Sequence, residues 1–236
     1  MKQLPRIGLS IIFCLSFTLI FMAGLRGQNL LQNPSFEDLR SRKPIVKPES
    51  AGKFAYQVPG WRKIGGSLRV CTDAYRGEEV DTTSFFCADG KVSPYTGSAM
   101  VEMEYVPQCI SPAMTRQGCS DYLAQELEQP LLFGKVYEVS MMVYIQSTSN
   151  PGYAKNIGFQ AYTEALGMRY NYMLEGREFL LDTVIFDQWY AAKWTIRPKC
   201  DLPFIVFGVF RNEQGPPVHN RKVSEDFFFF DDLRVV

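Results

Sequence analysis

The chain has only one histidine and no Cys-x-x-Cys pair, so it lacks the usual ingredients of two kinds of site. Zinc sites are built from clustered cysteine and histidine, and a Ser-His-Asp triad here would depend wholly on His219. No Gly-x-Ser-x-Gly turn, glycine-rich phosphate loop or His-Glu-x-x-His motif occurs. The sequence therefore gives little support to a hydrolase triad, a nucleotide site or a zinc enzyme.

An excess of positive charge is also missing, since 25 Lys and Arg residues face 25 Asp and Glu residues over 236 positions. The segment to Gly27 holds three of the basic residues and no acid, so the remainder has 22 basic against 25 acidic residues, a net charge near −3. A chain without a basic patch is not typical of nucleic-acid-binding proteins. Its 46% hydrophobic and 14% aromatic residues are enough to build a core and argue against disorder.

A long apolar run occurs once, at the N-terminus. Lys2 and Arg6 precede an uncharged stretch from Ile7 to Ala23, and small residues follow it, which is the layout of a secretory signal. We predict a signal peptide over residues 1–27 and an exported domain over 28–236, found at the cell surface, in the periplasm or secreted. A retained anchor is the alternative, because the stretch is near the lower length limit of a membrane span. No membrane span is predicted after cleavage.

Five cysteines follow the predicted signal, and an odd number leaves at least one unpaired within the monomer. In an oxidising compartment we predict the two short-range disulfides, Cys71 with Cys87 and Cys109 with Cys119. Closing a loop of about 15 residues in this way is worth about 3 kcal/mol in the chain-entropy model. Cys200 would then be buried and free, or would link to another chain.

Strand signals recur along the chain, and no long stretch shows helical periodicity, so we predict one all-β domain of nine or ten strands. Long loops are expected near 40–57 and 65–95, and a turn at 150–152. The expected strands are 30–36, one starting at 59–61, 97–105, two within 123–145 separated by a turn at 133–135, 157–162, 179–185, 189–196, 204–210 and 227–236.

The two ends of the predicted domain carry a family likeness. The chain reads Asn29-Leu-Leu-Gln-Asn-Pro-Ser-Phe-Glu-Asp38 after the signal and Phe227-Phe-Phe-Phe-Asp-Asp-Leu-Arg-Val-Val236 at the end. These segments resemble the first and last strands of galactose-binding-like jelly rolls, a group that includes many carbohydrate-binding modules. The resemblance implies an antiparallel β-sandwich of the jelly-roll type, a fold that hosts sugar binding, protein docking and purely structural roles.

The front half has a closer likeness, carried by short motifs spread over residues 29–137. They are 29–37, Pro59-Gly-Trp61, Cys71-Thr-Asp-Ala-Tyr75, Tyr95-Thr-Gly-Ser-Ala99 and 123–137. Together they resemble the N-terminal sandwich domain of many exported Bacteroidetes surface and outer-membrane proteins. In those proteins the sandwich is often followed by a peptidoglycan-binding or sorting domain, whereas this sequence stops at the last expected strand.

Three acids at the ends of the domain suggest a metal. Glu37 follows the first expected strand, and Asp231 and Asp232 lie in the last, so a jelly roll can bring their carboxylates close together. Related carbohydrate-binding modules often hold a structural calcium ion there, and calcium prefers six to eight oxygen ligands. The alternative is that these acids cap strand ends and face water.

A sugar site in such a module needs exposed aromatic side chains with polar neighbours. Tyr170 and Tyr172, with Arg169 and Asn171 beside them, are the predicted recognition surface. Trp61 and Trp189 begin strands and are further candidates, although large aromatic side chains are more often packed in a core. Trp194, Phe207 and the 227–230 run are expected in the core.

Residues for catalysis are few. Glu102 with Glu104, and Glu126 with Glu128, are paired carboxylates that could suggest glycoside hydrolysis, where two acids flank the bond. Residues two apart in a strand face the same way, but an exposed polar face explains them equally well. The first hypothesis is thus an exported, non-catalytic module that binds carbohydrate or another surface ligand. The second is a structural or adhesive envelope component that docks to protein. A polysaccharide-cleaving enzyme ranks last.

Overall fold

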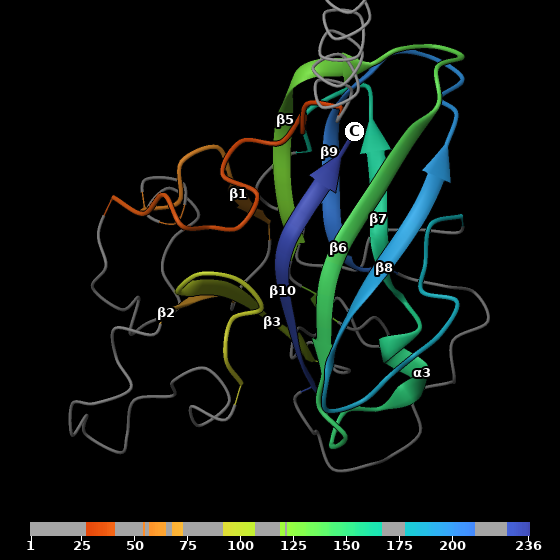
Figure 1. Ribbon diagram of the computed structural model, residues 1–236. Helices are drawn as coiled ribbons and strands as arrows, with labels where there is room; N and C mark the ends of the chain where they lie inside the picture. Colours follow the sequence, from red (N-terminus) through yellow and green to blue (C-terminus); the bar gives the residue numbers. More distant parts are fainter. Residues whose placement is uncertain are drawn as a thin grey trace, which may run out of the picture.

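The protein is a sandwich of two antiparallel sheets. The computed structural model describes residues 27–40, 54, 57–64, 68–72, 92–106, 119–120, 122–166, 178–210 and 226–236. Within these residues one sheet has the strand order β1-β5-β9-β7, and the other has the order β2-β3-β10-β6-β8 with β4 beside β3. Figure 1 shows β10, β6 and β8 in front of β5, β9 and β7. The predicted all-β sandwich is confirmed.

In the described part of the chain, the helical turn α3 lies among strands of two to ten residues. Their bounds are β1 (Arg62–Ile64), β2 (Arg69–Thr72), β3 (Ala99–Val106), β4 (Cys119–Ser120), β5 (Tyr122–Leu131), β6 (Tyr137–Ile145), α3 (Pro151–Ala154), β7 (Ile157–Tyr162), β8 (Trp189–Ile196), β9 (Leu202–Val209) and β10 (Asp226–Val235).

From β5 onward, successive strands alternate between the two sheets. β5, β7 and β9 belong to the smaller sheet, and β6, β8 and β10 belong to the larger one. Each connection therefore crosses from one layer to the other, as in jelly rolls, and every strand has one side toward the common core. The strands β7 and β8 have the bounds that the sequence predicts.

The core lies between the sheets and follows the period-two alternation of the strands. In β6, Val139, Met141, Val143 and Ile145 are all buried and belong to the main core cluster. In β10 the phenylalanines divide, since Phe228 and Phe230 join this core while Phe229 is buried in a second cluster on the other side of the sheet. The larger sheet is therefore covered on both faces at its centre.

The segment 30–36 is not a strand, contrary to the prediction. Asn33 and Phe36 have positive φ angles of 46° and 61°, which a strand does not accommodate, and Pro34 between them lacks an amide hydrogen. The segment still joins the two sheets, because the Leu30 amide donates to the Val235 carbonyl and the Leu30 carbonyl accepts from the Glu128 amide.

Two further predictions need correction. Residues 179–185 make only one isolated bridge, Leu180 with Gly158, so they do not form the predicted strand. Gly158 allows this close approach, because a side chain there would collide with the Phe179 carbonyl oxygen. The turn at 150–152 begins α3, whose N-terminal amides are capped by the Asn150 side chain through a 2.8 Å bond to the Gly152 amide.

Candidate functional site

One row of side chains crosses the outer face of the larger sheet. Glu102 of β3 is paired with Phe229 of β10, Phe229 with Tyr144 of β6, and Tyr144 with Trp189 of β8. Residues at paired positions of neighbouring strands point to the same side of a sheet. Because Phe228 and Phe230 face the core, this row faces outward.

Three rings at the β8 end of the row form what we call the outer aromatic patch: Tyr95, Tyr144 and Trp189. The ring centroids of Tyr144 and Trp189 are 5.7 Å apart, edge to face, and those of Tyr95 and Trp189 are 6.1 Å apart. Tyr95 is 48% exposed, and Trp189 and Tyr144 are partly exposed. Phe229 lies beneath them, with its ring 6.0 Å from that of Tyr144. The patch therefore combines accessible rings with a buried support.

The patch is held in place by the strand-to-loop segment 92–98. The indole nitrogen of Trp189 donates to the Ser93 carbonyl at 2.8 Å, and the Thr96 amide donates to Oδ2 of Asp231 at 2.8 Å. Val92 is buried in the same cluster as Phe229. These contacts fix both Trp189 and the backbone beside Tyr95, so the two rings are preorganised relative to each other.

Charged groups lie beside the rings. The Asp187 amide donates at 2.8 Å to the carbonyl of Ile145, the residue after Tyr144, and its carboxylate contributes, after burial, to raising the pKa of Tyr144. Its own pKa is lowered by hydrogen bonds from Ser147, whose amide donates to Oδ1 at 2.9 Å. On the Tyr95 side, Arg234 has a raised pKa, chiefly through its hydrogen bonds to Asp232, with a smaller contribution from Tyr95. The patch thus has an acid and a guanidinium near its aromatic surface.

The two candidate tryptophans have different surroundings in the fold. Trp61 is 1% exposed and packs against Phe36 and Phe207 in the core, with its indole nitrogen 2.9 Å from the Asn33 carbonyl oxygen. A ring so covered offers no face to a ligand, so Trp61 is a core residue and not a recognition residue. Trp189 lies in the outer aromatic patch. The predicted recognition residues Arg169, Tyr170, Asn171 and Tyr172 lie outside the described part of the chain.

Tyr144 and Tyr95 are members of the patch that the strand patterns did not single out as ligand residues. The alternation of β6 contains the signal for Tyr144. Val139, Met141, Val143 and Ile145 occupy the odd positions toward the core, which leaves Tyr144 on the opposite face. Tyr95 carries no such pattern, because its position depends on a loop contact with a strand almost a hundred residues later.

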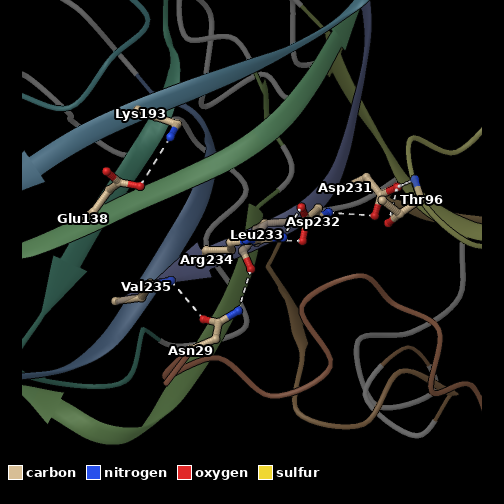
Figure 2. A network of polar contacts seen from close by, with 9 residues as sticks. All are labelled: Asn29, Thr96, Glu138, Lys193, Asp231, Asp232, Leu233, Arg234 and Val235. Atoms are coloured by element: carbon tan, nitrogen blue, oxygen red, sulfur yellow. Dashed lines mark hydrogen bonds and ion pairs between the residues drawn. The ribbon is translucent and has the colours of Figure 1, made fainter. Parts of the chain in front are cut away.

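The three acids predicted to bind calcium each have other partners. Oε1 of Glu37 accepts from the amides of Ser98 and Ala99 at 2.7 and 2.8 Å, and its Oε2 accepts from the Ser98 hydroxyl. Figure 2 shows Asp231 bonded to Thr96, and Asp232 paired with Arg234 at 2.9 Å. Among the described residues no group of three or more acids, cysteines or histidines is arranged to hold a metal. Calcium stays a prediction that these contacts do not support.

The backbone at Gly97 explains why Glu37 can reach the 96–99 segment. Gly97 has a φ of +59°, and an added Cβ would collide with the carboxylate of Glu37. Glycine is favoured where φ is positive and where a side chain approaches the backbone closely. Glu37 and Asp231 therefore both anchor the segment that carries Tyr95, one from each side, which gives these acids a structural role.

Two buried carboxyl groups of β10 have pKa values displaced upward. Burial raises the pKa of Asp231 to about 6, against hydrogen bonds from Thr96 and Asp232 that favour the ionised form. Burial also raises the pKa of Asp226 to about 6, and only the Asn150 amide opposes the shift. Among the described residues, the second oxygen of Asp226 has no hydrogen-bond partner. Asp226 lies in the core edge near Tyr105 and not in the patch.

The cysteine predictions are partly resolved. Cys71 is disulfide-bonded, and its pairing with Cys87 stays a prediction. Cys109 also lies outside them, and Cys119 begins β4. Cys200 is free and exposed, so the expectation that it would be buried is wrong, because it sits in the solvent-facing connection between β8 and β9.

The structure describes the side chains of three of the four candidate carboxylates, Glu102, Glu126 and Glu128. Glu126 and Glu128 are both exposed on β5. Glu102 is 1% exposed, with its Oε1 3.5 Å from the guanidinium of Arg69. His219 lies outside the described residues. No helix in the described part of the chain is long and apolar enough to cross a membrane.

No family model matches the chain, and no curated protein matches it. Among solved structures it is similar to the K1 adhesin domain of Lys-gingipain from Porphyromonas gingivalis W83, with a TM-score of 0.41 and 12% identity over 89% of this chain and 98% of that chain. The K2 adhesin domain gives 0.40 and 11%, over 86% and 96%. The CBM22-1 and GH10 modules of a Clostridium thermocellum xylanase 10B, solved with xylohexaose, give 0.38 and 16%, over 75% and 25%.

The names of these neighbours are those of adhesin domains and of a xylanase with a CBM22 and a GH10 module. Their TM-scores are too low to carry an argument about the ligand or the site. The fold assignment therefore rests on the sheet topology, and the functional argument rests on the outer aromatic patch.

Proposed function

We propose that the protein is an exported, non-catalytic β-sandwich module that binds carbohydrate through the outer aromatic patch. The observation that carries the proposal is the contact between Tyr95 and Trp189, whose rings are 6.1 Å apart and accessible on the outer face of the larger sheet. Sugars present apolar C–H faces that pack on aromatic rings, and their hydroxyl groups need directed polar partners. The patch offers both.

The polar partners would be Asp187 and Arg234. Asp187 is fully exposed, and its carboxylate is kept ionised by the hydrogen bonds from Ser147. An ionised carboxylate accepts hydrogen bonds from hydroxyl groups, and a guanidinium donates to their oxygens. A ring platform between an acceptor and a donor group fits a neutral saccharide better than a highly charged ligand.

Catalysis is not proposed. Glycoside hydrolysis needs two carboxyl groups on opposite sides of the scissile bond, one of them protonated. At the patch, Asp187 is ionised, and Asp232 is committed to Arg234 at 2.9 Å. The carboxyl groups with raised pKa values, Asp226 and Asp231, are both buried. A binding role is therefore the simpler assignment.

The test is binding of the chain from Gln28 to Val236 to a polysaccharide array. Every described strand and core residue follows Gly27, so this form keeps the whole described core. We expect specific polysaccharide binding that falls at least tenfold in Trp189→Ala and Tyr95→Ala, since stacked rings dominate such sites. Phe133→Ala is the matched control, because Phe133 is an exposed ring outside the patch.

Two results would count against the proposal. One is a blank array with folded protein, and the other is binding that both patch variants retain in full. Running the array with calcium and with chelator tests the calcium prediction separately. Since the three acids already have protein partners, we expect equal binding in both conditions.

A second candidate function is docking to an envelope protein, which the free, exposed Cys200 favours. An accessible thiol in an oxidising compartment can pair with a cysteine of another chain. A higher-mass band of the exported protein on a non-reducing gel that disappears in Cys200→Ser would support it. A monomer in cells under non-reducing conditions would oppose it.

A further inference from the structure

The end of the sandwich opposite α3 exposes an unusual amount of apolar surface. Four large hydrophobic side chains of the described residues are exposed, and three of them belong to this end: Phe133 at 70%, Val136 at 55% and Val236 at 38%. Figure 1 shows the β5–β6 connection, the β8–β9 connection and the C-terminal end of β10 together at this end. We call Phe133, Val136 and Val236 the apolar tip. Exposed apolar side chains gathered in one place mark interaction sites.

The apolar tip is held rigidly by hydrogen bonds. The Phe133 amide donates to Oδ1 of Asp201 at 2.8 Å, and the Gly134 amide donates to the Pro198 carbonyl at 2.9 Å. The amide and carbonyl of Val236 both bond to the backbone of Glu138. The ring of Phe133 therefore projects from a fixed turn. A protruding apolar side chain on a fixed backbone loses little conformational freedom when it inserts into another phase.

Positive charges surround the apolar tip. Lys135 lies between Phe133 and Val136, and Arg197 and Lys199 flank Pro198, whose carbonyl binds that turn. All three side chains are exposed. Two acids lie beside the tip: Asp201, whose Oδ1 accepts from the Phe133 amide, and Glu138, whose Oε1 is 3.6 Å from Nζ of Lys193. Apolar side chains among Lys and Arg are the pattern of proteins that rest on anionic lipid, where each cation adds attraction to the surface.

The chain also enters the sandwich at this end. Gly27 lies against Val236, since a Cβ on Gly27 would be 3.3 Å from the Val236 Cβ. The uncharged apolar stretch of the sequence ends at Ala23, four positions before Gly27. Four extended residues span about 14 Å at most. While that stretch occupies a membrane, as a signal before cleavage or as a retained anchor, the apolar tip must be close to the bilayer.

We propose that the apolar tip, with Lys135, Arg197 and Lys199, docks this end of the sandwich on the surface of an anionic phospholipid bilayer. The three apolar side chains enter the interfacial region, and the cations contact lipid phosphates. The outer aromatic patch does not contribute to this contact. The proposed membrane docking is therefore independent of the proposed sugar binding.

The test is co-sedimentation of the Gln28–Val236 chain with vesicles of phosphatidylglycerol and phosphatidylcholine, and with vesicles of phosphatidylcholine alone. We expect binding to the anionic vesicles that weakens with added salt. Phe133→Ser should lower the partition coefficient roughly tenfold, from the apolar area it withdraws. Lys135→Gln and Lys199→Gln should each lower it about fivefold.

Matched variants separate this site from the sugar site. Phe133→Leu should retain most of the vesicle binding, and Tyr95→Ala, which removes the other exposed aromatic ring, should retain all of it. Vesicle binding that is absent, or that Phe133→Ser leaves unchanged, would overturn the proposal. Concentration-dependent dimerisation that Phe133→Ser abolishes, without vesicle binding, would also overturn it and assign the tip to a second copy of the chain.

Discussion

Trp61 and Trp189 have similar places in the sequence, next to the start of a strand, but opposite surroundings in the fold. Each indole nitrogen donates to a loop carbonyl, Asn33 for Trp61 and Ser93 for Trp189, at 2.9 and 2.8 Å. The difference is what covers the ring. Trp61 lies between the sheets under segment 27–40, whereas Trp189 faces outward on β8 with the rings of Tyr95 and Tyr144 beside it.

The comparison shows that strand position alone does not separate a core aromatic residue from a recognition residue. What separates them is the face of the strand and the length of chain that folds over it. Trp61 is a packing residue because Phe36 and Phe207 contact its ring. Trp189 keeps a partly exposed ring on the outer face of the larger sheet, where Tyr95 and Tyr144 contact it.

The largest expected effect is on stability, from Trp61→Ala. Removing a fully buried indole leaves a cavity and an unpaired Asn33 carbonyl, so the free energy of unfolding should fall by about 3–5 kcal/mol. Trp189→Ala should lower it by no more than about 1 kcal/mol, because its ring is already partly in water. Urea denaturation of both variants measures the difference. Equal losses would break the distinction between the two tryptophans.

The next effect concerns Glu37, which joins the segment over Trp61 to the segment that carries Tyr95. Glu37→Ala leaves the amides of Ser98 and Ala99 without their acceptor, so we expect a loss of about 2 kcal/mol, measured by thermal or urea unfolding. Glu37→Gln is the control. Its carbonyl oxygen still accepts from both amides, so most of the stability should remain. A Gln variant as unstable as the Ala variant would contradict this account.

A third prediction contrasts an interior acid with an acid at the outer face. The pKa of Asp226 is raised by burial to about 6, so the folded state binds its proton more tightly than the unfolded state. The free energy of unfolding should therefore fall as pH rises from about 4 to about 6, and Asp231 adds a fall of the same sign. Asp226→Asn should remove its share, about 2 kcal/mol.

Asp187 is the matched control for this pH dependence. Hydrogen bonds from Ser147 lower its pKa, so any stability it contributes is present at neutral pH and is lost as pH falls through its folded-state pKa. Asp187→Asn should therefore leave the fall between pH 4 and 6 unchanged. Urea titrations at several pH values measure both variants, and a slope that Asp226→Asn does not reduce would contradict the assignment.

The smallest expected change in stability comes from Tyr95→Ala. Tyr95 is 48% exposed, so its removal should alter the free energy of unfolding by less than about 0.5 kcal/mol while it weakens carbohydrate binding. A denaturation curve recorded with the binding measurement checks both parts. A large stability loss would mean that the Tyr95 ring is packed as the Trp61 ring is. That result would contradict the distinction between core and patch residues.

The sequence predicts strands well where the local alternation of apolar residues agrees with the strand pairing in the fold. The alternation in β7 and β8 predicts their bounds, and the 123–145 block predicts β5, β6 and the turn between them. The 30–36 segment is not a strand because Asn33 and Phe36 have positive φ angles in a turn closed by the Phe36 amide, and the Pro34 carbonyl between them accepts from Leu233, far along the chain. The 179–185 segment has strand composition, but beyond the Gly158 bridge it does not continue as a ladder.

The candidate site is less predictable for the same reason. The pattern places Trp189 at a strand start and Tyr144 on an outward face, but neither shows that they touch. Their contact depends on β6 and β8 being neighbours, and the contact of Trp189 with Tyr95 depends on a loop anchored by Glu37 and Asp231. Such contacts depend on tertiary structure and cannot be predicted from local sequence patterns.

The most direct test is acrylamide quenching of tryptophan fluorescence with and without the carbohydrate that the array identifies, in the wild type and in Trp189→Phe. The account predicts that saturating ligand protects part of the emission in the wild type. In Trp189→Phe, where Trp61 and Trp194 remain, the ligand should give no protection. Equal protection in both proteins would place the ligand away from the outer aromatic patch and contradict the account.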